Sequence, residues 1–499
     1  MTLHTHTLYD MAEKNALAFG SAPCIVSGGA ELSFARFLDR VNAAASHMAS
    51  LGLSAGERVA IVSGNNPEYL IALVAASRLR ALAVAVNWRL SAEEIGHVLS
   101  DTSPRLVLAD APRMSSLAGT MKSLGLPCPL VDLASLGEGR SCEALPEPPE
   151  GPSGDDPFLI IHTAAVSGKA RGAVLSHHNM VLAALQSAAR FQLSEKDACL
   201  GFLPFFHILQ LVLTFAAMVA GGKNVVQEKF DPDDCLRQIS AHRVSLMGSF
   251  PPILAEITKA AERAEEIPRS LRAVVGIDAP ANIEPFQKIF ATDFFLLYGQ
   301  TETSGPVTLG PSRERPGSAG RPTALAMVKV VGECGIAPCK DNPGEIYIRG
   351  PLVFRGYWEG GKMDGPTFSD GWHKTGDLGY MDQAGYLFFA GRKPERELIK
   401  PGGENVFPAE VEAVLLSHEE VVEAVVIGVP DPRFGEAIRA LCVKKEGSSL
   451  SEKELIEFVA GRIARYKKPR EVIFVESLPR AAAGGVCRKT VKERYGAGQ

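Results

Sequence analysis

Phe294-Phe295-Leu296-Leu297-Tyr298-Gly299-Gln300-Thr301-Glu302-Thr303 is the stretch that says most about the fold. Its apolar start predicts a short buried strand, and its polar end predicts a loop at the carboxyl end of that strand. Similar apolar stretches, separated by helical patterns, occur before it at 158–161, 199–203, 224–227, 245–247 and 273–275. Strands that alternate with helices predict a doubly wound α/β unit around a mostly parallel sheet.

The first 110 residues show the same alternation. Ser33 is placed to cap a helix with apolar residues at helical spacing, and Pro67 opens a helix that runs to about Leu79. Short apolar strands are expected at 59–63, 82–86 and 106–109, with a helix from about Ala92 before the last of them. The sequence therefore predicts two α/β units, joined by a surface connection at about 135–156 that is rich in Pro, Gly, Ser and Glu.

The sequence pattern changes after about residue 316. Residues 344–350 and 386–389 alternate as antiparallel strands do. A charged, Gly- and Pro-rich break at 391–403 precedes helices expected at 408–416 and 451–461 and strands expected at 421–428, 437–444 and 471–475. We therefore expect a large N-terminal domain over 1–391, completed by a β-rich subdomain, and a small mobile α+β domain over 392–499.

The composition excludes several classes of protein. The chain has 499 residues, a formal net charge of −5, 46% apolar and 22% charged residues, which is ordinary globular usage without a general attraction to nucleic acid. The longest apolar stretches, 69–86 and 209–220, are too short or too interrupted to span a bilayer, so we expect buried core. The N-terminus lacks a secretory pattern, and nine scattered cysteines predict reduced thiols in a cytoplasmic protein. The sequence contains no pattern that predicts an oligomeric state.

Three further stretches carry residues suited to chemistry, and each is modest evidence alone. A loop of small residues, 163–172, follows the strand expected at 158–161 and reads TAAVSGKARG. Pro204-Phe205-Phe206-His207 follows the strand expected at 199–203. The last set comprises TGD at 375–377, Gly391-Arg392, and GGENVFPAEVE at 402–412.

In this order and spacing, these stretches and the first one resemble the adenylate-forming superfamily of acyl-CoA synthetases, luciferases and peptide-synthetase adenylation domains. The resemblance covers about Leu32 to Lys489, and its most specific parts are YGQTE at 298–302, TGD and GGENVFPAEVE, the last being most like acid–CoA ligases. It implies that a carboxylate attacks the α-phosphate of ATP and expels pyrophosphate, and that the thiol of coenzyme A then attacks the acyl-adenylate and releases AMP. Both steps build charge on oxygen atoms, so fixed donors and cations are expected to dominate catalysis.

The small-residue loop is expected to hold phosphate. Backbone N–H groups of such a loop can approach phosphate oxygens, although an ordinary βα loop has a similar composition. Ala164-Ala165-Val166 replace three small polar positions of the family, which predicts a weaker grip on the β- and γ-phosphates. The resemblance implies that Arg171 occupies the position of a family Lys and that phosphate is contacted by Thr163, Ser167, Gly168 and Gly172.

The motif at 298–302 is expected to surround the adenosine and the α-phosphate. The ring of Tyr298 is suited to stack on adenine, with core packing as the alternative. By resemblance, Gly299 and Gln300 contact the nucleotide and Thr301 offers its hydroxyl to the α-phosphate. Glu302 would bind Mg²⁺, a hard cation that prefers oxygen ligands, rather than being a solvated loop acid. Gly276 and Asp278 belong to the turn where the family contacts adenine, and Asp278 departs from its usual composition.

Asp377 and Arg392 are expected at the ribose. A carboxylate can accept both ribose hydroxyls, although T-G-D is also common turn chemistry. The resemblance implies ribose binding by Asp377 with help from Arg392. It also places His207 at the acyl or CoA side as a gate or positioning residue, and it places three residues at the pantetheine channel, namely Gly402, Gly403 and Glu404.

Two departures from the family pattern bear on activity. The segment between Arg392 and Gly402 is longer than usual, so the residue that absorbs domain rotation is expected within 393–397. The run 479–485 matches the pattern that supplies a Lys for adenylation, but Gly485 occupies the Lys position, with Arg488 and Lys489 as nearby cations. Loss of one transition-state cation typically slows a step by orders of magnitude.

The leading hypothesis is an ATP-dependent acid–CoA ligase for a fatty or aryl acid, using Mg²⁺. One alternative is an adenylating relative with another acceptor, and another is a catalytically impaired relative that binds nucleotide or acyl-CoA. Retention of Thr301, Glu302, Asp377 and Arg392 favours an enzyme. The apolar pocket candidates do not identify the acid; they are Phe206, Phe250, Pro251 and Pro252.

Overall fold

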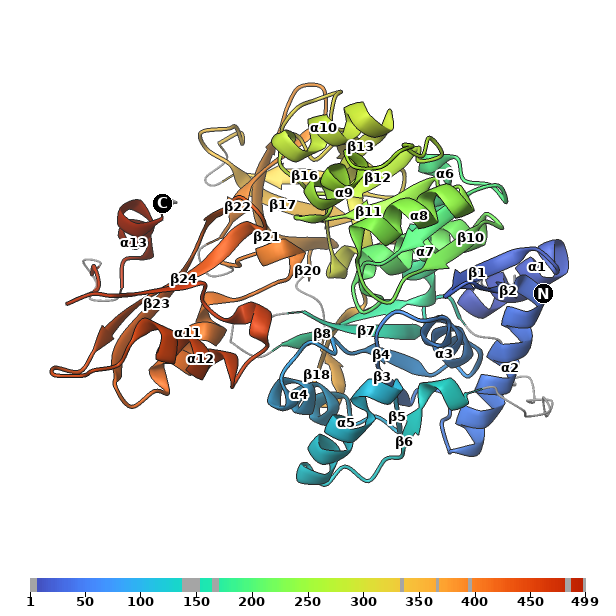
Figure 1. Cartoon of the computed structure of the whole chain (residues 1–499), viewed down its shortest axis with the longest axis horizontal. Coiled ribbons are helices and arrows are strands. Elements are labelled where there is room, and N and C mark those ends of the chain that lie inside the picture. The colour runs from blue at the N-terminus through green and yellow to red at the C-terminus, as the bar shows by residue number, and fades with distance from the viewer. Residues whose placement is uncertain are drawn as a thin grey trace.

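The computed structural model describes residues 7–136, 153–163, 170–332, 336–364, 368–393, 397–480 and 486–496. Most of the connection expected at 135–156 lies outside these residues. The described strands form four sheets. Two large sheets and their helices make up most of the molecule, and the C-terminal part, coloured orange to red, lies at one end of the long axis (Figure 1).

The first large sheet has nine strands in the order β15-β14-β13-β12-β11-β9-β10-β1-β2. Strands β13 through β1 in this order run parallel, and β14, β15 and β2 add antiparallel edges. Its strands are β1 Pro23–Ser27, β2 Ala30–Ser33, β9 Ala198–Gly201, β10 Lys223–Val226, β11 Leu246–Ser249, β12 Ala273–Gly276, β13 Asp293–Gln300, β14 Gly305–Pro311 and β15 Arg321–Pro322.

The second large sheet has eight strands in the order β19-β18-β8-β7-β4-β3-β5-β6. From β7 to β6 the strands are parallel, and β8, β18 and β19 are antiparallel additions. Its strands are β3 Arg58–Val62, β4 Leu82–Ala85, β5 Leu106–Ala109, β6 Leu130–Asp132, β7 Pro157–Thr163, β8 Arg171–Ser176, β18 Gly356–Glu359 and β19 Lys362–Asp364.

The two predicted α/β units are confirmed, but the chain divides between them differently from the sequence interpretation. β1 pairs with β10, with Ile25 opposite Asn224, so an N-terminal hairpin completes the nine-stranded sheet. β7 pairs with β4, with Ala83 opposite Leu159, so residues after the connection extend the first unit. These pairings join residues far apart in sequence, and no local hydrophobic pattern encodes such partners.

Helices cover the sheets and fill the space between them. In α3 (Pro67–Arg78), every residue from Tyr69 to Ser77 is buried. In α7 (Ile208–Val219), every residue from Leu209 to Met218 is buried. Such burial is expected for helices that are apolar on all sides. Both expected core segments are therefore confirmed. The remaining helices of this part are α1 Leu8–Phe19, α2 Phe34–Ser50, α4 Ala92–Thr102, α5 Ala111–Ser123, α6 His177–Phe191, α8 Pro232–His242, α9 Ile253–Ala261 and α10 Pro280–Phe290.

Local capping follows the sequence closely. Ser33 caps α2 as predicted, because its side chain accepts a hydrogen bond from the Arg36 N–H. None of the described helices combines the length and the apolar content needed to cross a bilayer.

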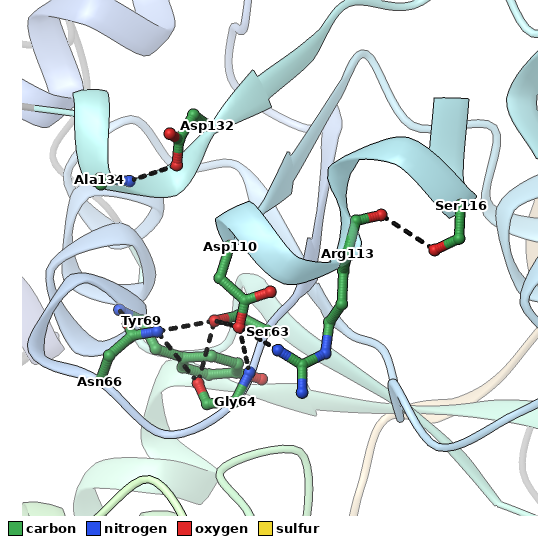
Figure 2. Close-up of polar contacts among 9 residues, drawn as sticks. All are labelled: Ser63, Gly64, Asn66, Tyr69, Asp110, Arg113, Ser116, Asp132 and Ala134. Atoms are coloured by element: carbon green, nitrogen blue, oxygen red, sulfur yellow. Dashed lines mark hydrogen bonds and ion pairs between the residues drawn. The ribbon is translucent and has the colours of Figure 1, made fainter. Parts of the chain in front are cut away.

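A hydrogen-bond network fixes the carboxyl end of β3 (Figure 2). Asp110, just before α5, accepts from the Ser63 hydroxyl at 3.0 Å and from the Gly64 N–H at 2.8 Å, and it pairs with Arg113. The intervening Asn65 links the two large sheets, since its Nδ2 donates to the Leu203 carbonyl at 2.8 Å. The turn predicted after this strand therefore connects the two large sheets through a hydrogen bond.

A third sheet has five strands and corresponds to the predicted β-rich subdomain. β16 (Met327–Val331), β17 (Gly344–Arg349), β21 (Trp372–Met381) and β20 (Phe368–Ser369) lie in this order, and β22 (Leu387–Arg392) pairs with β21. The hairpin of β21 and β22 leads directly into the C-terminal part.

The C-terminal part has its own sheet, in the order β23-β24-β25, and its own cluster of buried residues, which includes Val411, Leu415, Val426 and Val472. Its small α+β fold is as predicted. Its elements are the turn η5 Pro401–Gly403, α11 Pro408–Leu416, β23 Val421–Asp431, β24 Gly435–Lys444, α12 Glu452–Ala460, the turn η6 Arg465–Lys467, β25 Glu471–Phe474 and α13 Arg488–Tyr495.

Candidate active site

A cavity of about 1490 Å³ lies where the two large sheets, the five-stranded sheet and the C-terminal part meet. Gly172, Gly276 and Tyr298 do not line it, and Ser167, Gly168 and Gly485 lie outside the described residues. The other predicted site residues do line it; they are Thr163, Arg171, His207, Asp278, Gly299, Gln300, Thr301, Glu302, Asp377, Arg392, Gly402, Gly403 and Glu404. The fold thus gathers motifs from across the chain into one cavity.

The carboxylate of Asp377 is held by three donors. Strands β21 and β22 place Asp377 opposite Arg392, whose Nε donates to Oδ1 at 2.8 Å. The Tyr298 hydroxyl and the Gln300 Nε2, both from the end of β13, donate to Oδ2 at 2.8 Å each. Asp377 is only 2% exposed, yet it lines the cavity. A buried, paired and multiply hydrogen-bonded carboxylate is a rigid acceptor at this wall.

Tyr298 packs behind this carboxylate. Burial and the adjacent Asp377 raise the pKa of Tyr298 well above its usual range, so its hydroxyl remains a donor. Its ring stacks on Phe389 with centroids 6.1 Å apart and an interplanar angle of 27°. Phe389 is 48% exposed and lines the cavity, so the ring that faces the cavity here is that of Phe389. Sequence reasoning missed Phe389, although it lies in the alternating stretch 386–389.

Hydroxyl and carboxylate oxygens surround the short turn η2 (Thr301–Thr303). Glu302 Oε1 accepts from the Tyr357 hydroxyl at 2.8 Å and from Thr163 Oγ1 at 3.2 Å. The guanidinium of Arg171 lies over the Tyr357 ring, 4.0 Å from its centroid. Sequence reasoning also missed Tyr357, which reaches the site because β18 pairs with β8.

This donor set fits Mg²⁺. The described residues contain no cluster of three or more Asp, Glu, His or Cys side chains able to hold a metal alone. Mg²⁺ is usually bound through one or two carboxylates together with substrate phosphates and water, rather than by an all-protein cage. Glu302, with hydroxyl oxygens around it, is a carboxylate of that kind.

The end of β12 requires glycine. A Cβ atom at Gly276 would lie 1.7 Å from the Ser249 carbonyl oxygen, so no side chain fits where β11 and β12 approach. Two residues later, Asp278 Oδ1 accepts from the Ala279 N–H at 2.8 Å and from Asn282 Nδ2 at 2.7 Å. Burial raises the pKa of Asp278. Gly276 therefore shapes this wall, and Asp278 contributes a side chain to it.

The glycine-rich turn of the C-terminal part reaches the same cavity. Gly402 and Gly403 have φ values of 60° and 85°, which glycine adopts without a steric penalty. The turn presents Glu404 to the N-terminal part, where Glu404 Oε1 lies 2.7 Å from Arg89 Nη1 and Oε2 lies 3.2 Å from His207 Nε2. Burial alone would raise the pKa of Glu404, but His207 and Arg89 outweigh it and hold the pKa below its usual value.

Lys400 is a further cavity residue that sequence reasoning missed. Burial, with the neighbouring Arg392 as a second cause, lowers the pKa of Lys400 to about 8. A Lys in a charged, Gly- and Pro-rich break is typical of a solvated surface, so the sequence offers no signal that Lys400 lines a cavity.

The two cations near position 485 have different surroundings. Arg488 Nη2 lies 2.6 Å from Glu412 Oε2, and Arg488 Nη1 donates to the Val426 carbonyl at 2.9 Å. Lys489 is exposed and lines the cavity. Arg488 also lines the cavity, but its guanidinium is bonded to Glu412 and to the Val426 carbonyl within the C-terminal part, whereas Lys489 is the more exposed of the two.

This fold is that of an AMP-binding enzyme. The family model for the AMP-binding enzyme matches residues 12–358, and that for the AMP-binding enzyme C-terminal domain matches residues 410–484. The chain belongs to this adenylate-forming family, in the branch of the AMP-forming acid–CoA ligases. It is 31% identical over 475 residues to the long-chain-fatty-acid–CoA ligase FadD13 of Mycobacterium tuberculosis, covering 93% of each chain. It is 33% identical over 482 residues to the indoleacetate–CoA ligase of Aromatoleum aromaticum, again covering 93% of each.

Solved structures of one relative differ in their similarity to this chain. A double mutant of o-succinylbenzoate CoA synthetase (MenE) from Bacillus subtilis, bound to its product analogue OSB-NCoA, has a TM-score of 0.86 at 28% identity and covers 97% of this chain and 98% of its own. The same enzyme in complex with AMP has a TM-score of 0.70 at the same identity and coverage. Because one enzyme is compared in both cases, the difference is conformational. The present arrangement is nearer to that of the product-analogue complex.

Proposed function

We propose that this chain joins a fatty or aryl carboxylic acid to the thiol of coenzyme A with ATP as the activating substrate. The acid attacks the α-phosphate, which gives an acyl-adenylate and pyrophosphate. The thiol then attacks the acyl carbon, and AMP leaves. The observation that carries this proposal is the rigid Asp377 carboxylate, set in one cavity with Glu302 and the Gly402–Glu404 turn.

The Asp377 end of the cavity is assigned to adenosine. A carboxylate has about four acceptor sites, and Arg392, Tyr298 and Gln300 use three of them. The remaining site can accept a ribose hydroxyl. Phe389 offers an exposed ring to the adenine, with Tyr298 stacked behind it.

The Glu302 end is assigned to the phosphates. The Thr301 hydroxyl is a donor for a phosphate oxygen, the Thr163 hydroxyl would turn from Glu302 to donate to another, and Arg171 supplies a positive charge beside them. Glu302 would hold Mg²⁺, which when bound offsets the negative charge of the phosphates. The predicted contacts of Ser167 and Gly168 remain part of this assignment.

The Gly402–Glu404 turn is assigned to the thiol channel of coenzyme A. The ties from Glu404 to Arg89 and His207 place this turn against the N-terminal part. The higher similarity to the product-analogue complex supports the view that this arrangement serves thioester formation. In this proposal the parts 1–391 and 392–499 rotate between the two steps about a hinge within 393–397.

Different cations are assigned to the two steps. In the present arrangement Lys400 faces the Asp377 end, where its charge would stabilise the departing AMP. For adenylation, we assign to Lys489 the charge that Gly485 does not supply, because Lys489 is exposed, whereas Glu412 of the same C-terminal part holds the Arg488 guanidinium and would keep it during rotation.

The acid is assigned to the apolar end of the cavity. Of the four pocket candidates, Phe250, Pro251 and Pro252 line the cavity and Phe206 does not. Further apolar side chains support a fatty or aryl acid; they are Phe202, Leu203, Leu209, Phe230 and Leu297. The described cysteines are free thiols, which supports a cytoplasmic location.

Mass spectrometry of reactions with Mg-ATP, coenzyme A and a panel of fatty, aryl and alicyclic acids tests the proposal. Acyl-CoA and AMP in equal amounts are expected with at least one acid. ATP binding without AMP formation across the panel, in both the unaltered protein and Gly485→Lys, would favour the alternative that the protein is a catalytically impaired relative. An adenylate that forms but never reaches coenzyme A would favour another acceptor.

A further inference from the structure

We infer that Glu94 is a positioning residue for thioester formation, which holds the C-terminal part in its present arrangement through Lys467 and Ala464. The inference rests on the proposed two-step function. Glu94 lies in the first turn of α4, within the N-terminal part, and Lys467 lies in the turn η6 of the C-terminal part. Glu94 does not line the cavity, so it acts on the reaction only through the arrangement of the two parts.

Both oxygens of the Glu94 carboxylate are used across this contact. Oε1 accepts from Lys467 Nζ at 2.6 Å, and Oε2 accepts from the Ala464 N–H at 3.0 Å. Oε2 also accepts from the Ser91 N–H at 2.8 Å, which completes the capping box at the start of α4. The bond from the Ser91 N–H therefore orients the Glu94 carboxylate independently of its contacts with the C-terminal part.

Burial makes this pair different from a surface ion pair. Lys467 is only 6% exposed, and the Glu94 side chain is 19% exposed. Exposed pairs contribute little because water and salt screen them, whereas partly buried pairs are screened much less. The Glu94–Lys467 contact can therefore bias the arrangement of the two parts.

Lys467 has a second carboxylate partner in Glu410 of α11, within the C-terminal part itself. Rotation of that part would separate Lys467 from Glu94 but would leave Lys467 beside Glu410. The ammonium thus keeps a partner in either arrangement, and the bond to Glu94 belongs to the present one alone. A contact made in only one of two states shifts the population toward that state.

The same N-terminal segment also carries the ties to the thiol channel. Arg89 pairs with Glu404 at 2.7 Å, and Asn87 Nδ2 lies 3.5 Å from the Tyr466 hydroxyl. Residues 87–94 therefore dock both the glycine-rich turn and the turn that holds Lys467. Within this segment, Glu94 binds the turn that holds Lys467, and Arg89 binds the glycine-rich turn through Glu404.

The test compares Glu94→Gln with Glu93→Gln, which removes the same charge from the exposed neighbouring position. Glutamine keeps a carbonyl oxygen for the Ser91 cap, so α4 is expected to fold normally. Hydrogen exchange of the protein without substrates is expected to be faster at 462–468 in Glu94→Gln and unchanged at 437–444, in the core of the C-terminal sheet. Exchange in Glu93→Gln is expected to match that of the unaltered protein.

The two half-reactions are then measured separately with an acid that the panel identifies. Transfer from preformed adenylate to coenzyme A is expected to fall about tenfold in Glu94→Gln, which is the size of an ordinary coupling between sites, while adenylate formation changes by less than about twofold. An equal fall in both half-reactions would overturn the inference, as would unchanged exchange at 462–468. If no acid forms an adenylate, the proposed function fails, and the exchange experiment still decides whether Glu94 holds the two parts together.

Discussion

Arg392 donates to Asp377 across the β21–β22 pair at 2.8 Å, at the point where the chain leaves the five-stranded sheet for the C-terminal part. The carboxylate assigned to ribose is thus paired with the last residue before the proposed hinge. Nucleotide bound at Asp377 would contact the base of the moving part, which gives a physical route by which binding and rotation can influence each other.

Asp377→Asn is predicted to abolish most nucleotide binding. The amide places an NH₂ group among donors and leaves Arg392 without its buried partner. Loss of one member of a buried pair costs about 3–5 kcal/mol of stability, and we expect the affinity for ATP to fall by about two orders of magnitude. Calorimetric titration and denaturant unfolding measure these effects. Asp382 lies at the turn of the same hairpin and pairs with the more exposed Arg315 away from the cavity, so Asp382→Asn should leave ATP affinity unchanged. Full ATP affinity in Asp377→Asn would contradict the assignment.

Glu302→Gln is predicted to raise the Mg²⁺ concentration required for adenylation. The amide oxygen can still accept from Tyr357 and Thr163, so the fold should persist, but the charge that attracts the cation is lost. We expect the half-saturating Mg²⁺ concentration in pyrophosphate exchange to rise about tenfold, the effect of losing one good charge-assisted contact. Glu314→Gln, whose side chain bonds to Tyr386 outside the cavity, is the matched control. An unaltered Mg²⁺ dependence would show that Glu302 does not bind the metal.

Lys400 gives a pH-dependent prediction. Its pKa is lowered from 10.5 to about 8 in the folded chain, so between these pH values the unfolded chain binds a proton that the folded chain has lost. The free energy of unfolding is therefore expected to rise with pH in that window, and the full penalty applies below about pH 8. Lys400→Met should be more stable near neutral pH and should lack this rise, whereas the exposed Lys196→Met should keep it. Denaturant unfolding at several pH values measures the difference, and identical pH dependence in all three proteins would show that folding does not lower the pKa of Lys400.

A Lys at position 485 is predicted to replace Lys489 as the cation for adenylation. Lys489→Met should slow adenylate formation by about two orders of magnitude, the usual effect of losing one transition-state cation. Gly485→Lys should restore the rate in the Lys489→Met background, because it supplies a charge at the position where the family pattern has its Lys. Single-turnover formation of adenylate without coenzyme A is the measurement. Normal adenylation in Lys489→Met alone would mean that a different group supplies the charge.

Two glycine substitutions are predicted to have opposite effects on stability. Gly276→Ala would force a methyl group against the Ser249 carbonyl and is expected to cost about 1–3 kcal/mol or more, as overpacking does. Gly119→Ala lies in the interior of α5 with open space around its Cβ position, so it is expected to stabilise by about 0.5–1 kcal/mol. Thermal unfolding of both variants checks the signs, and a neutral Gly276→Ala would contradict the close approach of β11 and β12.

Local patterns in the sequence predict much of this fold and part of the site. The strand ends that carry Thr163 and Tyr298–Glu302 are recognisable because an apolar run stops at polar residues, whereas Asp377 lies within β21 and is recognisable from its TGD motif. The helix caps and the small C-terminal fold follow from the same local rules. These signals depend on residues close together in the chain, which is why they can be read without a structure.

The missing parts depend on distant pairing. Tyr357 reaches Glu302 only because β18 pairs with β8. The N-terminal hairpin pairs with β10, which lies far from it in the sequence. The sequence around Lys400 and Glu94 is typical of exposed charges. Only the contact between the N-terminal and C-terminal parts places Lys400 at the cavity and Glu94 beside Lys467. No periodicity encodes such contacts, since each one is created by two segments that have independent local patterns.

The most direct test of the two-step mechanism follows labelled oxygen from the acid into AMP. The acid that the panel identifies is prepared with oxygen-18 in its carboxylate and converted with Mg-ATP and coenzyme A. The acyl-adenylate account predicts one oxygen-18 atom in AMP, because the carboxylate oxygen that attacks the α-phosphate stays on phosphorus when the thiol takes the acyl group. Unlabelled AMP, or the release of ADP and phosphate in place of AMP and pyrophosphate, would contradict the account.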